Sequence, residues 1–382
     1  MASTTDTKAK YRREWFAYCE PLGVDPYLAK ETTSFQVRAR VLSGFAARTR
    51  RGAFGRGRQI GAGSVATALT AVGQAISLDT GINPAKNEGS KELIYPLQVM
   101  MSGFKKEDPA TVKKLPVEAD IPNFLAGLGR RQGGTAKDRA IGDLTLIAFY
   151  FLLRIGEYTM KQCRNESKQT VNFRVVDVTF FKKDGDGKLR QLPHNASKED
   201  ILTADSATLR LTNQKNGWKG VCINHHVNGD SYYCPVKALG RRIVHIREHS
   251  NDGDLGICAF FNGGCQFDVN DNDIRQALKF AAAELDYPER GIPIDRVDTH
   301  SLRSGGANAL SLAGYADRAI QKMGRWRSST FLEYISDQLS AFSKGMSTSM
   351  SKVLGFVNIA GGVSHDVTSI AINSNYNSAA AA

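Results

Sequence analysis

The stretch "LTLIAFYFLLRIGEY", residues 144–158, runs from a long apolar segment into a charged corner. Residues 144–153 carry no charge and are too few to span a bilayer, so they predict a buried helix over about 137–153. Arg154 ends this helix, and Glu157 follows three residues later. Because an arginine beside a core needs a partner, we expect Glu157 to orient the Arg154 guanidinium, either for chemistry or as a structural ion pair.

The length and composition indicate a folded soluble chain of about two domains. Of its 382 residues, 42% are hydrophobic and 23% are charged. The polar N-terminus "MASTTDTKAKYRREW" shows no signal peptide, and the six cysteines lack the tight spacing of a disulfide framework. We therefore expect reduced thiols and an intracellular location, in the nucleus if the source is eukaryotic.

The charge distribution favours a polyanionic partner. Fifty basic side chains against 38 acidic ones give a net charge of +12, and no acidic residue occurs from Thr32 to Leu78. Within that span, "AARTRRGAFGRGR" (46–58) mixes arginines with glycines, as a loop along a phosphate backbone would, although a solvated basic loop or a localisation signal would look the same. The arginines expected to bind DNA are Arg48, Arg50, Arg51, Arg56 and Arg58.

Sequence patterns divide the chain into three parts. Residues 1–109 form a helical domain, since apolar periodicity and Gly, Pro and Asn punctuation predict helices at about 8–20, 34–49, 63–78 and 92–104. The two prolines of "EDPATVKKLP" (107–116) mark a boundary, after which residues 110–345 form a second domain. Residues 346–382, rich in Ser, Ala and Asn, predict a flexible tail. A small apolar cluster within it should bury against a protein surface, either of the same chain or of another protomer, and we favour the second.

The second domain combines helices with a few strands. Period-2 patterns at 171–181 and 207–227 predict strands, the second of them as a hairpin that turns around Asn216 and Gly217. Helices are expected around them at about 119–129, 137–153, 234–249, 270–285 and beyond residue 298. The predicted fold class is therefore mainly α with a small antiparallel sheet (α+β).

Further polar residues accompany these elements. In "THSLRSGGANAL" (299–310), His300 and Arg303 share one face of a helix, and the two glycines after them suit the close approach of a backbone or a ligand. Lys215 lies at the hairpin tip, with Lys219 as an alternative. His300 would also serve as a capped surface histidine, and Lys215 as an ordinary turn lysine.

The stretch "GRWRSSTFLEYI" (324–335) indicates a corner followed by a helix. Thr330 and Glu333 fit a capping box, which places Tyr334 in the first helical turn. Unpaired N–H groups and the helix dipole favour an anion there, so the Tyr334 hydroxyl is a candidate nucleophile toward a phosphate. Tyr334 and Trp326 would also serve as ordinary packing aromatics.

The order Arg, hairpin Lys, His-x-x-Arg, Trp, Tyr resembles the tyrosine recombinase (phage integrase) family over roughly 115–345. The pieces "LLRIGE", "HSLRSGGA" and "GRW…FLEYI" carry the resemblance, and "CPVKAL" and the GRW corner look most like recombinases of eukaryotic mobile elements. Trp in place of the commoner His also occurs in the Cre recombinase. The catalytic set that the resemblance implies is Arg154, Lys215, His300, Arg303, Trp326 and Tyr334.

The resemblance implies a core-binding domain over 1–109, a catalytic domain over 110–345, and DNA cleavage through a 3′-phosphotyrosine on Tyr334, without a cofactor. Arg154 and Arg303 would hold the phosphate oxygens, while His300 and Lys215 would move protons. Trp326 would donate its indole N–H or pack the corner. The implied partners are double-stranded DNA and a tetramer of the protein on paired DNA sites.

Two other functions use the same features. A type IB topoisomerase would use the same tyrosine chemistry as a monomer, and a domesticated DNA-binding protein would keep the fold without cutting. A zinc site is also conceivable, but one of its four residues falls on the opposite face of the strand, so we expect no metal. The four residues are Cys222, His225, His226 and Cys234.

Overall fold

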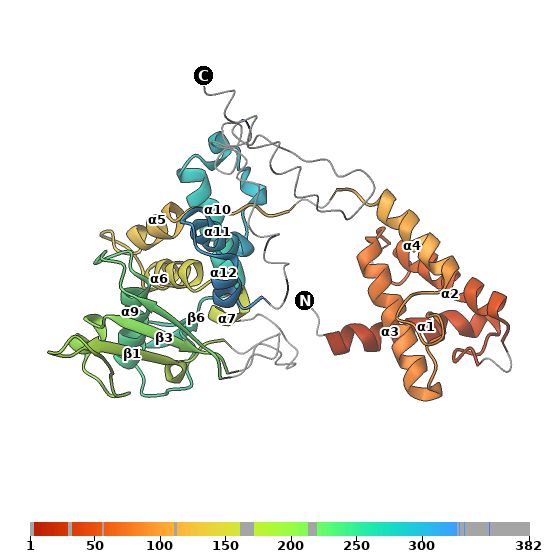
Figure 1. The fold of residues 1–382 in the computed structure, drawn as a ribbon, viewed down its shortest axis with the longest axis horizontal. Helices are drawn as coiled ribbons and strands as arrows, with labels where there is room; N and C mark the ends of the chain where they lie inside the picture. Colours follow the sequence, from red (N-terminus) through yellow and green to blue (C-terminus); the bar gives the residue numbers. More distant parts are fainter. Residues whose placement is uncertain are drawn as a thin grey trace, which may run out of the picture. The chain divides into compact units, whose positions relative to one another are not determined.

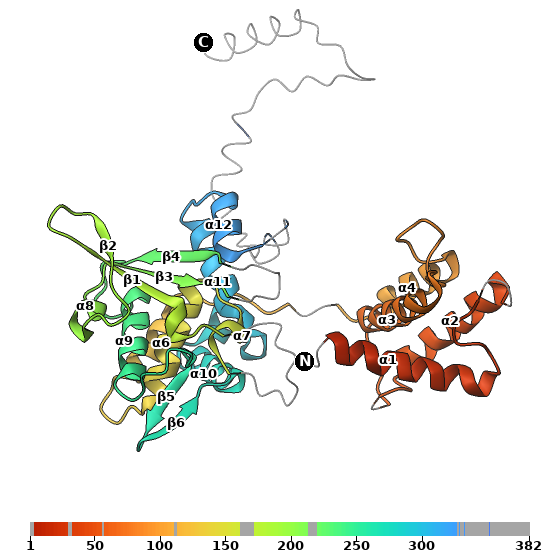
Figure 2. The ribbon, with the colours of Figure 1, turned by 90° about the horizontal axis from the view of Figure 1, so that it is seen from below.

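The computed structural model describes residues 4–29, 33–55, 57–110, 113–160, 172–212, 220–326, 328, 332 and 351. These residues form two compact units, one up to Lys113 and one from Lys114 onward (Figures 1 and 2). Among the described residues, no helix combines the length and apolar character needed to cross a membrane.

The first unit is helical. Ser34 begins its second α-helix by accepting a hydrogen bond from the backbone N–H of Val37. The core forms where aromatic side chains meet between helices, with the Trp15 and Phe45 rings edge to face at 5.2 Å. Its helices are α1 (Thr4–Cys19), η1 (Glu20–Leu22), α2 (Phe35–Arg50), α3 (Ala62–Thr80) and α4 (Tyr95–Glu107).

The second unit is built around α6 (Ala136–Tyr150), in which every residue from Ala140 to Phe149 is buried. Thr135 and Asp138 form a capping box that fixes where this helix begins. Helices pack on several sides of α6 (Figure 1), which accounts for its apolar sequence. They are α5 (Asp120–Leu128), α9 (Pro235–Arg247), α10 (Asp271–Glu284) and α11 (Thr299–Leu312).

A four-stranded antiparallel sheet lies against α9, which contacts β3 and β4 (Figure 2). Its strand order is β2-β1-β3-β4, and β3 and β4 form a hairpin with Ser206 opposite His226. A separate hairpin pairs β5 with β6. The strands are β1 (Val178–Lys183), β2 (Leu189–Gln191), β3 (Ser206–Arg210), β4 (Cys222–His226), β5 (Ala259–Asn262) and β6 (Cys265–Asp268).

The prediction of a mainly α fold with a small antiparallel sheet is confirmed, with one local correction. The strand expected over 171–181 begins only at Val178, because the preceding residues form the 3₁₀ turn η2 (Val175–Asp177). The Asp177 carboxylate stabilises that turn by accepting from the backbone N–H of Arg174 at 3.0 Å and from its Nε at 3.1 Å. The remaining short helices are α7 (Ile155–Tyr158), α8 (Lys198–Leu202), η3 (Tyr287–Arg290), η4 (Ile294–Arg296) and α12 (Asp317–Gly324).

Candidate active site

The chain turns sharply after α6. The helix predicted to reach residue 153 ends at Tyr150, because Leu152 adopts a left-handed backbone conformation with φ of 49°. The Leu152 side chain is fully buried among Ala307, Ile320 and Trp326, and this packing holds the unusual backbone in place. The turn leaves the Leu152 carbonyl free of helical bonding and brings Arg154 to the start of α7.

Arg154 and Glu157 form the pair that the sequence predicted. Arg154 Nη1 lies 3.1 Å from Glu157 Oε1, and the Arg154 backbone N–H donates to Glu157 Oε2 at 2.9 Å. The Glu157 side chain is completely buried, whereas that of Arg154 is 21% exposed. The carboxylate therefore holds the guanidinium from the protein side and leaves part of it open to solvent.

His300 and Arg303 lie one turn apart on α11, whose first residues are capped by Asp298 and Ser301. His300 is exposed and Arg303 is buried. The two glycines that follow have a packing role, since a Cβ at Gly305 would overlap the Val117 carbonyl, and one at Gly306 would overlap that of Phe149. The close approach expected at these glycines is therefore made by the protein's own backbone.

Arg303 connects α11 to two other segments of the chain. Its Nη1 donates to the Leu152 carbonyl, and its Nη2 donates to the Gly324 carbonyl at the end of α12. The Trp326 ring covers the guanidinium, with its centroid 4.3 Å from Cζ. Only 1% of Arg303 is exposed. Unlike Arg154, it therefore faces the protein rather than solvent.

Helix α12 ends in a left-handed corner at Arg325, with φ of 58°. The N–H of Arg325 donates to the Lys322 carbonyl, and that of Trp326 donates to the Gln321 carbonyl, which is the bonding of a Schellman motif. Glycine usually fills this position, because a side chain there costs about 1–2 kcal/mol. Glycine instead precedes it, at Gly324, where the Trp326 ring occupies the space of a side chain.

The Arg325 side chain explains why an arginine occupies this position. Its Nη2 lies 2.8 Å from Glu157 Oε2 and also donates to the Leu152 carbonyl at 3.1 Å. Arg325 is 1% exposed, and burial lowers its pKa, although the adjacent Glu157 carboxylate favours the charged form. The sequence analysis missed this residue. The signal was an arginine directly after the glycine that opens the predicted corner.

These contacts join segments far apart in the sequence. Arg154 and Arg325 share the Glu157 carboxylate, while Arg325 and Arg303 share the Leu152 carbonyl. The structure thus gathers three of the six predicted catalytic residues, Arg154, Arg303 and Trp326, with His300 one turn away on α11. The other two, Lys215 and Tyr334, lie outside the described residues, as do Lys219 and the proposed capping box at Thr330 and Glu333.

Arg50 does not fit the DNA-binding role predicted for it. Its side chain is 6% exposed, and Nη1 donates to the Ile60 carbonyl at 2.6 Å and to the Asp108 carboxylate. Asp108 also accepts from the backbone N–H of Ala62, and these two contacts, with the backbone one the stronger, lower the pKa of its carboxyl. Arg50, the last residue of α2, therefore links that helix to the start of α3 and the end of α4.

The other arginines of this loop point outward where they are described. Arg48, Arg51 and Arg58 are exposed, and the Arg48 guanidinium lies over the Tyr18 ring, 5.6 Å from its centroid. Arg56 lies outside the described residues. The turn itself is compact, because the chain folds back so closely that a Cβ at Gly52 would overlap the Arg58 carbonyl.

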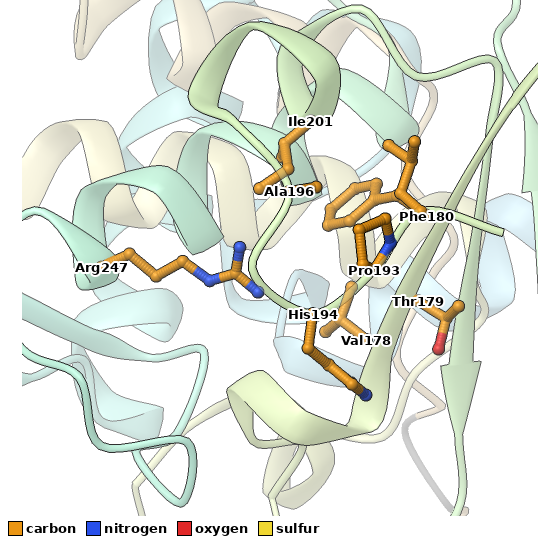
Figure 3. Close-up of a pocket in the computed structure, with 9 residues that line it drawn as sticks. Val178, Thr179, Phe180, Pro193, His194, Ala196, Ile201 and Arg247 are labelled. Carbon is orange, nitrogen blue, oxygen red and sulfur yellow. The ribbon is translucent and has the colours of Figure 1, made fainter.

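Two other places in the second unit bear on where a ligand could bind. The four residues weighed above as an alternative zinc site are not gathered, since His225 bonds the Tyr150 carbonyl at 2.8 Å, and no group of three metal-binding side chains occurs in the described part of the chain. A small hollow with both polar and apolar lining lies between β1, α8 and the end of α9, where Arg247 and His194 line it (Figure 3). None of the predicted catalytic residues lines that hollow.

Comparison with known proteins gives a fold-level similarity without a sequence match. No family model and no curated protein matches the chain. Similar solved structures include the Tn1549 transposon integrase in complex with circular intermediate DNA, at 12% identity over 81% of this chain and 86% of that one, with a TM-score of 0.43.

Two further structures are comparable. The XerA recombinase is 14% identical over 92% of this chain and 100% of that one, with a TM-score of 0.37. The XerH site-specific recombinase bound to its difH substrate is 15% identical over 84% of this chain and 72% of that one, with a TM-score of 0.43. All three TM-scores are below 0.5, so these similarities carry no argument about function.

Proposed function

We propose that the protein is a site-specific DNA recombinase or integrase that cuts and rejoins double-stranded DNA through a 3′-phosphotyrosine on Tyr334. The observation that supports this most is the assembly of Arg154, Arg303 and Trp326 at one place from three distant segments. Those residues were selected from the sequence as parts of one phosphate-handling set. Arg154 and Arg303 are linked through Arg325, which shares the Glu157 carboxylate with Arg154 and the Leu152 carbonyl with Arg303.

Arg154 is the group best placed to meet the DNA phosphate. Its guanidinium is planar and permanently charged, is held from behind by Glu157, and keeps part of its surface in solvent. It would bind the non-bridging oxygens and stabilise the additional charge that develops as the phosphorus becomes pentacoordinate. This positive charge serves the role that a metal ion serves in other phosphoryl-transfer sites.

Arg303 would join that contact only after a local change. Its two Nη groups now donate to backbone carbonyls, and Trp326 covers it. A phosphate oxygen can replace the Gly324 carbonyl as acceptor if the corner at 324–326 moves by a small amount. We therefore assign Arg154 to the first encounter with phosphate and Arg303 to the engaged site.

The chemical step follows from the remaining residues. The Tyr334 hydroxyl oxygen attacks the phosphorus, His300 accepts the tyrosine proton, and the bond to the 5′-oxygen breaks. Lys215 donates a proton to that oxygen, which leaves as a 5′-hydroxyl. The reverse reaction, with a 5′-hydroxyl from another duplex, joins the exchanged strands. Two duplexes must be cut for exchange, so we propose that four protomers assemble on paired DNA sites. The protein would act in the cellular compartment that holds the DNA.

A nicked duplex that traps the covalent intermediate tests this function. The wild-type protein should form an adduct that survives denaturation, whereas Tyr334→Phe should bind the same DNA and form none. An adduct with the Phe variant would move the nucleophile to another tyrosine, with Tyr315 next. Binding without any wild-type adduct would indicate an inert DNA-binding protein, and efficient relaxation of supercoils by a monomer would indicate a topoisomerase.

A further inference from the structure

Arg325 combines three features that are seldom found in one residue. It is buried, it holds a left-handed conformation that usually belongs to glycine, and its guanidinium bonds residues about 170 positions earlier in the chain. Its Nε is also buried with no hydrogen-bond partner among the described residues. The position therefore carries both backbone strain and a desolvated charge, and a purely structural corner needs neither.

We propose that Arg325 is a positioning residue that fixes Glu157, so that Glu157 can hold Arg154 toward the DNA phosphate. The two arginines use different oxygens of the same carboxylate: Arg154 Nη1 lies 3.1 Å from Oε1, and Arg325 Nη2 lies 2.8 Å from Oε2. Oε2 also accepts from the Arg154 backbone N–H at 2.9 Å. Because both oxygens are engaged, the Glu157 carboxylate is held in one orientation, and this fixes the orientation of the Arg154 guanidinium. This role of Arg325 rests on the proposed function, because it presupposes that Arg154 binds a DNA phosphate.

The charges support the same role. Glu157 alone would neutralise Arg154, which would weaken attraction for an anion. With Arg325 present, two guanidinium groups face one carboxylate, and the cluster keeps a net positive charge. Arg325 is almost fully buried and Arg154 is partly exposed, so the surplus is presented to solvent at Arg154.

Arg325 also couples this pair to the corner. The Leu152 carbonyl accepts from both Arg325 and Arg303, and the residue after Arg325 is Trp326, which covers Arg303. The orientation of Arg154 and the placement of Trp326 are thus set by the same side chain. A loss of Arg325 should disturb the chemistry more than the binding of DNA, because binding also uses exposed arginines elsewhere.

Substitution by glycine separates the side chain from the backbone. Arg325→Gly removes the strain of the left-handed conformation and keeps the Schellman bonding, but it deletes the guanidinium. If the position only shapes the corner, Arg325→Gly should be fully active. If the guanidinium positions Arg154, adduct formation at saturating nicked DNA should fall by about 100-fold while the DNA dissociation constant stays within about threefold.

Arg325→Lys and Arg290→Ala complete the set. Lysine keeps the charge but not the planar guanidinium that contacts Glu157 and the Leu152 carbonyl, so it should rescue part of the rate. Arg290→Ala removes a partly exposed arginine and should match wild type. If Arg325→Gly does not fold, Arg325→Lys decides, with a loss of about tenfold expected. A cleavage rate of folded Arg325→Gly within about threefold of wild type overturns the proposal. If that variant does not fold, the same result with Arg325→Lys overturns it.

A second measurement does not depend on activity. In the ¹⁵N spectrum of arginine side chains, the Arg154 signal, assigned by its loss in Arg154→Lys, should show the restricted guanidinium rotation expected for a held group. Arg325→Gly should shift and broaden that signal, and Arg290→Ala should not. An unchanged Arg154 signal in Arg325→Gly refutes the positioning role, whether or not the wild-type protein forms an adduct. The absence of a wild-type adduct would instead count against the proposed function alone.

Discussion

Replacing Glu157 by glutamine removes the one negative charge that two arginines share. The side chain of Glu157 is completely buried and that of Arg325 is 1% exposed, so this contact is hardly screened by water. Loss of one partner from such a buried pair costs about 3–5 kcal/mol, because the other charge is left uncompensated. The Arg154 contact adds little, since that side chain is 21% exposed.

Glutamine keeps one acceptor oxygen, so we expect the lower end of that range, about 3 kcal/mol. For a unit of this size each kcal/mol lowers the melting temperature by about 2–4 °C, which gives a shift of about 6–12 °C. Scanning calorimetry of the full chain would measure it. Hydrogen exchange of peptides from α6 would show that the loss lies in the second unit.

The matched control is Glu248→Gln. Glu248 forms an ion pair with Lys198, and their side chains are 45% and 64% exposed, respectively. This exposed pair should contribute less than about 1 kcal/mol. The double variant of Glu157→Gln with Arg325→Met should recover part of the loss, because the buried Arg325 charge that had lost its carboxylate is then removed as well. A Glu157→Gln shift no larger than that of Glu248→Gln would refute the electrostatic reasoning.

Three further outcomes are expected. Lys215→Ala should slow cleavage at an ordinary 5′-oxygen but much less at a 5′-bridging phosphorothiolate, whose leaving group needs no proton; if Lys219→Ala shows this rescue instead, the general acid is Lys219. Replacing three exposed arginines by glutamine should flatten the salt dependence of DNA binding by up to about 0.9 in log–log slope per lost phosphate contact. Arg50→Gln should instead lower the stability of the first unit. An unchanged salt slope would assign the loop to another role. Truncation after Lys344 should preserve binding to a single site and abolish synapsis, and normal recombination by the truncated protein would remove the tail from assembly. The three arginines are Arg48, Arg51 and Arg58.

The sequence alone determined most of the elements and the pair at the end of α6. The apolar run before Arg154 could only be a buried helix, and a charge at its end needed a partner within reach, which Glu157 supplied three residues later. Local patterns of this kind suffice because helix periodicity, caps and turn residues act between neighbours in the chain. The spacing of His300 and Arg303 on α11 is of the same kind.

Only the tertiary structure decided which of the arginines face solvent. Arg50 and Arg303 lie in stretches that look as accessible as those of Arg48 and Arg154, yet both are buried. Arg50 bonds the distant Asp108 carboxylate, and Arg303 bonds the distant Leu152 carbonyl. The contacts of Arg325 could not be identified from the sequence, because its partners, Glu157 and the Leu152 carbonyl, lie about 170 residues earlier in the chain. Burial and ion pairing depend on which surfaces meet in space, and no pattern between sequence neighbours records that.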